Sequence, residues 1–223
     1  MEELKTTIKA QRTREHIFEV ALRLFGSKGY AETTLRDIAK EAGVSLGLTY
    51  RYYASKEDLL LVLYERLAGE CAGAVTQLPR GGMGARFAHA LNDMIERLAP
   101  YREALGSLFA VGLTANSEMA VLGQRASGVR TTMWGVYQSV VTGAKDAPGT
   151  KAAEQVTTML YAAHLLVVLY WLQDRSEGQR ATRELISFAG KMLQRLRPFL
   201  GLPGVAKPLT QLSRLLAPMF GPT

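Results

Sequence analysis

Apolar residues in the first part of the chain recur every three or four positions, which is the spacing of one face of an α-helix. The first such face lies in residues 11–25, and two glycines end it. It consists of Ile17, Val20, Ala21, Leu24 and Phe25. A second face, capped by Thr33 or Thr34, consists of Leu35, Ile38, Ala39 and Ala42. The pattern therefore predicts two helices joined by a short turn.

Serines mark the start of two further helices. Ser45 caps a brief helix of about residues 46–53, and Ser55 forms a capping box with Asp58 that opens a helix reaching about residue 74. A linker follows, made of Pro79, Gly81, Gly82 and Gly84. Beyond it we expect helices at about residues 85–98, 101–113, 118–141, 151–174, 179–197 and 209–220. Since no segment alternates as a strand would, the sequence predicts an all-α fold.

The segment of residues 33–45, TTLRDIAKEAGVS, has the spacing of a helix-turn-helix. Ala39 is small where the two helices cross, and Gly43 supplies the turn. Val44 and Ile38 fill the small core beneath the turn. The second helix is then held away from the body, where its N-terminal residues can enter a DNA major groove.

Residues 12–60 resemble the TetR family of bacterial regulators. The likeness includes Leu24-Phe25, Gly29-Tyr30, the tyrosine-rich stretch of residues 50–53 and the SKEDLL stretch of residues 55–60. The resemblance implies an N-terminal three-helix helix-turn-helix domain, residues 1–55, followed by a larger helical ligand-binding and dimerisation domain, residues 56–223, with a linker near 78–84. It also implies double-stranded operator DNA, a second copy of the chain and a small-molecule inducer as partners.

The resemblance further implies two sets of DNA-contacting residues. The phosphate contacts are Thr33, Tyr50, Tyr52 and Lys56, and the residues that face base edges are Arg36, Ser45, Leu46, Gly47, Leu48 and Arg51. Chemistry agrees for two of them, because Lys56 lies at a helix N-terminus and Arg51 can form a bidentate pair with guanine. Many relatives carry lysine at position 46 and threonine at position 48. Because leucine cannot donate to a base, we expect readout here to depend on thymine methyls and arginines.

Composition changes this picture little. The chain has 48% apolar residues and a formal net charge of +7, but residues 1–66 hold 11 basic against 10 acidic side chains. The narrower stretch of residues 9–56 is net basic, 9 against 5. Cys71 is the single cysteine, and no Cys/His cluster has metal-ligand spacing, so we expect no disulfide, metal or cofactor. The chain shows no signal peptide, and the apolar run of residues 159–172 is shorter than the ~20 residues of a membrane span, which favours a cytoplasmic protein.

No catalytic motif occurs, so we expect a regulator and not an enzyme. We expect an inducer pocket lined by Phe87, Met94, Phe109, Met133, Trp134, Tyr137, Tyr161 and His164. Acidic candidates for this pocket are few, namely Glu103, Glu118 and Glu154, which favours a neutral or anionic ligand. If His164 is buried, its partner is either a ligand or a backbone carbonyl. These side chains also fit an ordinary helical core.

An apolar face on the segment of residues 179–197 predicts the dimer interface, together with the apolar segment before it. It consists of Leu185, Ile186, Ala189, Met192, Leu193 and Leu196. Nearby Ser187 and Gly190 are small enough for close approach. The expected function is a repressor that a ligand releases from a palindromic operator. Alternatives are an activator, a ligand-independent DNA-binding protein of the same fold, a DNA-processing protein, and a ligand-carrying bundle whose helix-turn-helix is vestigial.

Overall fold

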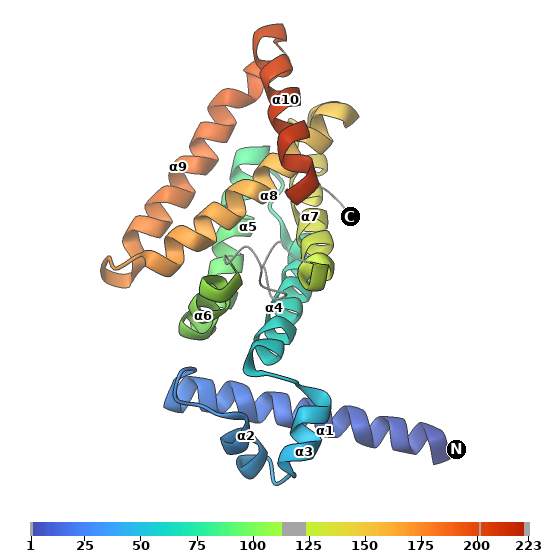
Figure 1. Ribbon diagram of the computed structural model, residues 1–223. Helices are drawn as coiled ribbons and strands as arrows, with labels where there is room; N and C mark the ends of the chain where they lie inside the picture. The colour runs from blue at the N-terminus through green and yellow to red at the C-terminus, as the bar shows by residue number, and fades with distance from the viewer. Residues whose placement is uncertain (1, 113–123, 201, 221–223) are drawn as a thin grey trace.

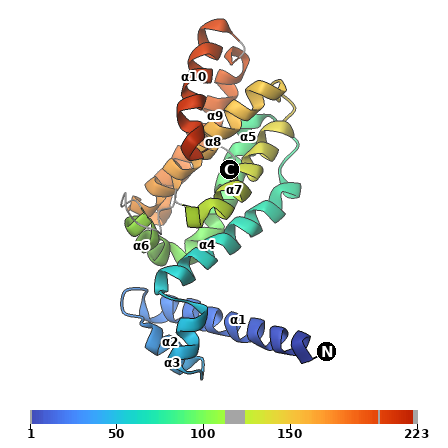
Figure 2. The same ribbon diagram turned by 45° about the vertical axis from the view of Figure 1, so that its right-hand side comes forward.

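The computed structural model describes residues 2–112, 124–200 and 202–220, and across these residues it contains helices and no strand. The all-α prediction is confirmed. Figures 1 and 2 show a small lower unit and a larger upper unit, with one helix running between them. The first four helices are α1 (Glu2–Lys28), α2 (Leu35–Glu41), α3 (Leu46–Tyr52) and α4 (Lys56–Gly73).

The lower unit has a core of apolar side chains, of which the sequence pattern placed Ile17 and Ile38 inward. Ile17, Phe18 and Ile38 are fully buried, and so are Leu59 and Leu60 at the start of α4. Tyr53 is also buried, and its hydroxyl donates to the backbone carbonyl of Arg14, 3.1 Å away. The start of α4 thereby completes the core of the helix-turn-helix unit.

The upper unit consists of the longer helices that follow. They are α5 (Met83–Leu98), α6 (Arg102–Gly112), α7 (Ser127–Thr142), α8 (Thr150–Gln173), α9 (Arg180–Leu196) and α10 (Pro203–Phe220). Short 3-10 turns join several of them, at Ala74–Gln77, Ala99–Tyr101, Gln124–Ala126, Glu177–Gln179 and Arg197–Phe199. Glu118, which the sequence placed at the start of the helix before residue 141, lies outside the described residues.

Helix α4 connects the two units physically. Its N-terminus is fixed by the predicted capping box, in which the Asp58 amide donates to the Ser55 hydroxyl, 3.2 Å away, and the Ser55 amide donates to the Asp58 carboxylate, also 3.2 Å away. The other carboxylate oxygen of Asp58 pairs with Arg125, before α7, at 2.6 Å. Further along α4, Arg66 pairs with Glu15 of α1 at 2.7 Å. These ion pairs join α4 to the turn before α7 above and to α1 below.

Helix α5 begins at Met83, so Gly84 lies within the helix and not in a linker. A Cβ atom built on Gly84 would lie 2.2 Å from the backbone oxygen of Gly190 in α9, and one built on Gly190 would lie 2.8 Å from the oxygen of Gly84. The two helices therefore cross with their backbones in contact. Close packing of helices, and not turn geometry, explains the glycine at position 84.

Helix α8 is long and apolar enough, by length and composition, to cross a membrane. However, 56% of its most apolar window is buried by other parts of the fold. Trp171, Tyr161 and Val168 on α8 are almost fully buried. This segment is a core helix, and its apolar run of residues 159–172 is shorter than a membrane span.

Candidate DNA-binding surface and ligand domain

The turn between α2 and α3 has the geometry that its sequence predicts. Gly43 has φ +65°, a left-handed conformation that glycine adopts without steric cost. The amide of Val44 donates to the carbonyl of Ala39, 3.0 Å away, and closes the turn. Thr34 caps α2 in a capping box with Asp37, which settles the choice between the two threonines.

Helix α3 presents a small exposed face. The Leu48 amide donates to the hydroxyl of Ser45, 3.1 Å away, which caps the helix. Thr49 is fully buried and fixes the inner face of α3. Gly47 and Arg51 are exposed, and 53% of the Tyr50 surface is accessible. A glycine, an aromatic ring and a guanidinium are therefore displayed together on one short helix.

The acidic residues of α2 are paired with basic residues of α1. Lys28 Nζ lies 2.8 Å from the Asp37 carboxylate, and Arg23 lies 3.3 Å from that of Glu41. The hydrogen bond from Lys28, with those from Thr34, holds the pKa of Asp37 well below its usual range. The carboxylates of α2 are thus charge-compensated locally. The exposed Arg36 of α2 then adds to a positive surface beside α3.

Not every residue implied by the resemblance lies on the surface. Thr33 is fully buried, and its hydroxyl donates to the carbonyl of Gly29, 2.7 Å away. A phosphate contact from this side chain would require the α1–α2 turn to open. Leu46, Leu48 and Tyr52 are half-buried. The sequence therefore overstates how much of α3 faces outward.

Lys56 lies at the N-terminus of α4 and bridges to the α1–α2 turn. Its ammonium donates to the carbonyls of Tyr30 and Ala31, at 2.8 and 3.3 Å, and lies 4.4 Å from the centre of the Tyr30 ring. Because an ammonium has three N–H donors, these two hydrogen bonds leave one donor of Lys56 available. Lys56 is thus held at the edge of the helix-turn-helix surface.

Aromatic side chains gather between α5, α7 and α8 in the upper unit. Tyr137 of α7 is fully buried; its ring lies 5.8 Å from that of Phe87 and is stacked on the ring of His164 at 5.2 Å. The ring of Tyr161 is 6.4 Å from Tyr137 and 6.2 Å from Phe220 of α10. We call Phe87, Tyr137, Tyr161 and His164 the aromatic cluster. The fold brings together these four residues from three helices.

Two buried polar atoms have no hydrogen-bond partner among the described residues: the Tyr137 hydroxyl of the aromatic cluster and the indole nitrogen of Trp134, about one turn earlier on α7. His164 does have a partner, since its Nδ1 lies 3.1 Å from the backbone carbonyl of Tyr161. Burial lowers the pKa of His164 to about 3, so its imidazole is neutral at physiological pH. The unpartnered atoms are the ones that a ligand could satisfy.

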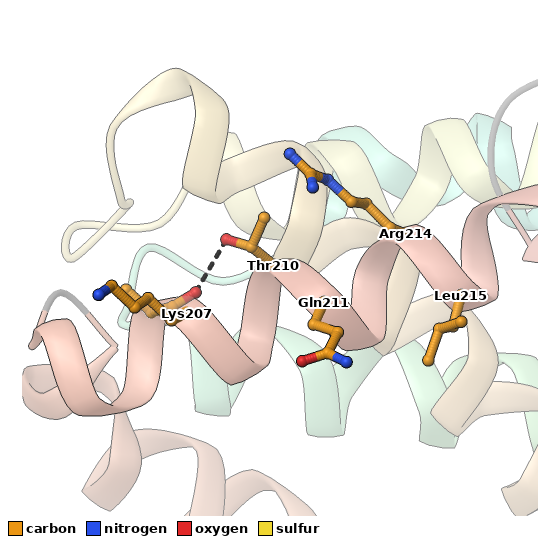
Figure 3. Close-up of a pocket in the computed structure, with 6 residues that line it drawn as sticks. Lys207, Thr210, Gln211, Arg214 and Leu215 are labelled. Atoms are coloured by element: carbon orange, nitrogen blue, oxygen red, sulfur yellow. Dashed lines mark hydrogen bonds between the residues drawn. The ribbon is translucent and has the colours of Figure 1, made fainter.

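The cavities differ from the predicted pocket. Met94 and Met133 line a cavity of about 20 Å³ between α4, α5 and α7, which has room for a single water molecule. A much larger hollow, about 680 Å³, lies along α10 and is lined by Ala206, Lys207, Thr210, Gln211, Arg214 and Leu215. In Figure 3, Arg214 points to one side of α10 while Gln211 and Leu215 point to the other, so these side chains do not converge on a ligand.

One member of the predicted apolar face of α9 is buried within the chain. Ile186 is 1% exposed, and Gly190 is packed against α5 of the same chain. Gly190 therefore allows close approach to α5, where the sequence suggested a partner, whereas Ser187 is exposed. The remaining members, Leu185, Ala189, Met192 and Leu193, are half-buried, and Leu196 is 48% exposed.

Other apolar side chains on α8 and α9 do face outward. Phe188 is 60% exposed, Leu166 67% and Tyr170 45%. Sequence reasoning missed these three residues. Helical periodicity identifies an apolar face that will be covered, but it does not say what covers that face or which apolar side chains stay exposed in one chain. Their large exposed apolar groups are the better signal for a contact between chains.

Fold and surface together define a helix-turn-helix DNA-binding protein with a helical second domain. Two family models match it. One, described as bacterial regulatory proteins of the tetR family, matches residues 17–63, and the other, described as the tetracyclin repressor-like C-terminal domain, matches residues 86–197. The chain belongs to the TetR family of transcriptional regulators, as its N-terminal motifs indicated.

Comparisons with single proteins agree. The HTH-type transcriptional regulator AcrR of Shigella flexneri is 48% identical over 61 residues, which are 27% of this chain and 28% of that protein. A tetR-family regulator of Streptomyces coelicolor has a TM-score of 0.62 at 18% identity, covering 94% of this chain and 90% of that one. FadR of Bacillus subtilis, solved in complex with stearoyl-CoA, has a TM-score of 0.55 at 17% identity, covering 78% and 96%. At 18% and 17% identity, the likeness to these two solved structures concerns the fold alone.

Proposed function

We propose that this regulator is a cytoplasmic repressor that binds a palindromic operator as a homodimer and leaves it when a small-molecule ligand binds. The observation that carries the DNA-binding part is the exposed face of α3, with Tyr50 and Arg51, beside α2 carboxylates neutralised from α1. A basic, uncompensated surface on a helix that can enter a major groove suits DNA. A dimer places two such helices about 34 Å apart, which predicts an inverted repeat.

In the proposed complex the two sets of side chains have different tasks. Arg36, Ser45, Leu46, Gly47, Leu48 and Arg51 face base edges, while Tyr50, Tyr52 and Lys56 bind phosphates. Of the apolar members, Leu46 and Leu48 offer only methyl contacts, to thymine. Thr33 keeps its buried hydroxyl and orders the turn behind Lys56. Specificity therefore depends chiefly on the arginines.

Arg51→Ala should relax sequence preference, whereas Lys56→Ala should weaken binding to all sequences alike. The reason is that base contacts carry sequence information and phosphate contacts do not. Removing a bidentate arginine should cost about 1–3 kcal/mol on the preferred site, and removing Lys56 should lower the salt slope by about 1 per half-site. Selection from a random DNA library gives the operator, and titrations on it and on random DNA give the two losses.

Equal loss on operator and random DNA for Arg51→Ala would remove Arg51 from base reading. A wild-type chain that recovers no preferred sequence from the library would contradict the proposed function and favour a vestigial helix-turn-helix. Recovery of an operator at which transcription rises would favour an activator.

We propose that the ligand binds around the aromatic cluster, with Met94, Phe109, Met133 and Trp134 completing the site. The unpartnered Tyr137 hydroxyl and Trp134 indole nitrogen support this, because a buried donor without an acceptor costs free energy that a ligand oxygen would recover. The apolar surroundings and the neutral His164 favour an uncharged apolar ligand with a hydrogen-bond acceptor. FadR of Bacillus subtilis, which is similar in fold, was solved in complex with stearoyl-CoA, a ligand whose acyl chain is apolar.

Ligand entry must separate side chains that are packed together, since the cavity beside Met94 and Met133 holds about 20 Å³. Binding therefore selects a conformation in which the helices of the upper unit have moved. If that conformation places the two α3 helices at the wrong spacing for the groove, DNA is released. A 100-fold fall in operator affinity requires a coupling of about 2.7 kcal/mol.

Tyr137→Phe and Trp134→Phe should each raise the ligand concentration needed for release by about tenfold, because each removes one hydrogen bond of about 1–1.5 kcal/mol. Operator affinity without ligand should stay unchanged. The measurement is operator release across a library of apolar metabolites and drugs, repeated on the variants with each hit. Tyr101→Phe, which removes a hydroxyl outside the aromatic cluster, is the matched control. Variants that respond as wild type does would assign these side chains to the core alone.

A further inference from the structure

Helix α1 is much longer than the helix-turn-helix unit requires. It has 27 residues, and of its side chains that the structure describes, which begin at Ile8, the first one buried in the core is Ile17. At 1.5 Å per residue the part before Ile17 is roughly 22 Å long. Figures 1 and 2 both show this part projecting beyond α3 into open space. We call residues 2–16 the α1 projection.

No side chain described in the α1 projection is buried, although Glu15 pairs with Arg66 of α4 and the Arg14 carbonyl accepts from Tyr53. From Ile8 to His16 each side chain is exposed or half-buried, and Ile8 itself is 42% exposed. The segment is helical because good helix formers such as glutamate, lysine, arginine and alanine dominate it, continuous with the anchored part of α1. Its role is therefore to be sought in what its surface meets.

One face of the α1 projection is basic. Lys9, Arg12 and His16 are spaced by three and four residues, so they lie on one side of the helix. All three side chains are exposed. Glu19, one turn further toward the body, ends the run of basic residues. We call Lys9, Arg12 and His16 the basic stripe.

The basic stripe lies on the side of α1 that carries the helix-turn-helix. Arg23 follows His16 after seven residues and therefore lies on nearly the same face, with a drift of about 20°. Arg23 reaches Glu41 of α2, 3.3 Å away. By contrast, Glu15, about 100° around the helix from His16, reaches Arg66 of α4 at 2.7 Å. The stripe thus faces the side of α2 and not the side of α4 and the upper unit.

We infer that the α1 projection is an accessory DNA-binding element, in which Lys9 and Arg12 contact phosphates outside the half-site that α3 reads. Charge complementarity and continuity with the helix-turn-helix surface both point to the same duplex as the occupant. A length of roughly 22 Å corresponds to about six nucleotides at 3.4 Å per step along a strand. The inference goes beyond the proposed function by extending the footprint into flanking sequence, and it rests on the DNA-binding part of that function.

The test uses the full chain with Lys9→Ala and Arg12→Ala combined. Neither side chain is buried, and alanine favours helix, so the variant should fold as the wild type does. The matched control combines Lys207→Ala and Arg214→Ala on α10, which removes the same charge from two exposed positions of the upper unit. Affinities are measured on operator duplexes that end at the inverted repeat and on duplexes with about ten added base pairs on each side.

Wild type and control should bind the long duplex at least about tenfold more tightly than the short one at low salt, whereas the double variant should bind both alike. On the long duplex the salt slope of the double variant should be smaller by about 2 per half-site, at 0.9 per phosphate contact. Preference among operator sequences should not change.

Equal flank dependence in wild type and double variant would overturn the inference while leaving the operator complex intact. An unchanged salt slope in the double variant would do the same and would assign the stripe to solvent or to an acidic protein partner. Absence of any sequence-specific complex with the wild type would contradict the proposed function itself, and the inference with it.

Discussion

Gly84→Ala should lower the free energy of unfolding by about 3 kcal/mol or more, the upper range for overpacking a well-packed contact. The added methyl would lie 2.2 Å from the backbone oxygen of Gly190 and 3.1 Å from Cβ of Gln194. Backbone atoms cannot rotate away as a flexible side chain can, so α5 and α9 would have to separate. Chemical denaturation of wild type and variant under identical conditions gives the difference.

Two glycine variants calibrate this result. Gly135→Ala in α7 meets no atom within 4 Å and should stabilise the protein by about 0.5–1 kcal/mol through helix propensity. Gly190→Ala should lie between the two, since its methyl would meet the Gly84 oxygen at 2.8 Å and Ala88 Cβ at 2.9 Å. A Gly84→Ala variant as stable as Gly135→Ala would mean that the helices do not cross in contact.

Phe188→Glu should convert the dimer to a monomer and raise the dimer dissociation constant by about 1000-fold or more. Phe188 of α9 is 60% exposed in one chain, and Leu166 and Tyr170 of α8 are exposed too; we propose that these side chains form the dimer interface. In a two-fold interface each substitution occurs twice, and an unpaired charge buried there costs about 2–5 kcal/mol. Because a monomer reads one half-site, operator affinity should fall as well. Light scattering at micromolar concentration and operator titration give the two readouts.

Leu215→Glu on α10 is the matched control, since Leu215 is an apolar side chain with 70% exposure on a different surface. It should leave the dimer intact. Dissociation by Leu215→Glu but not by Phe188→Glu would move the interface to α10, and a monomeric wild type would contradict the dimer altogether.

Much of the DNA-binding unit could be predicted because the interactions that form it are between residues close in sequence. The caps at Thr34, Ser45 and Ser55 each bond to an amide three residues away, so the chemistry lies within one turn of sequence. Gly43 is required by its own backbone conformation. Such short-range constraints also make the family motif recognisable. Arg51 is exposed, as its expected contact with a base edge requires.

The tertiary structure decided what the sequence left undetermined. Gly84 could be read as a linker glycine until α9, about a hundred residues later, was seen to lie against it. Likewise the apolar face of α9 predicts burial without naming α5 as the surface that buries Ile186. The basic stripe of α1 is not part of an apolar pattern from which its orientation could be predicted. Only the contact of Arg23 with Glu41 shows that the stripe lies on the α2 side of the helix. Local hydrogen bonds form between neighbouring residues, so composition and spacing determined which helices the chain forms. What covers the apolar face of a helix depends on helices distant in sequence, so only the fold determined which helices pack against one another.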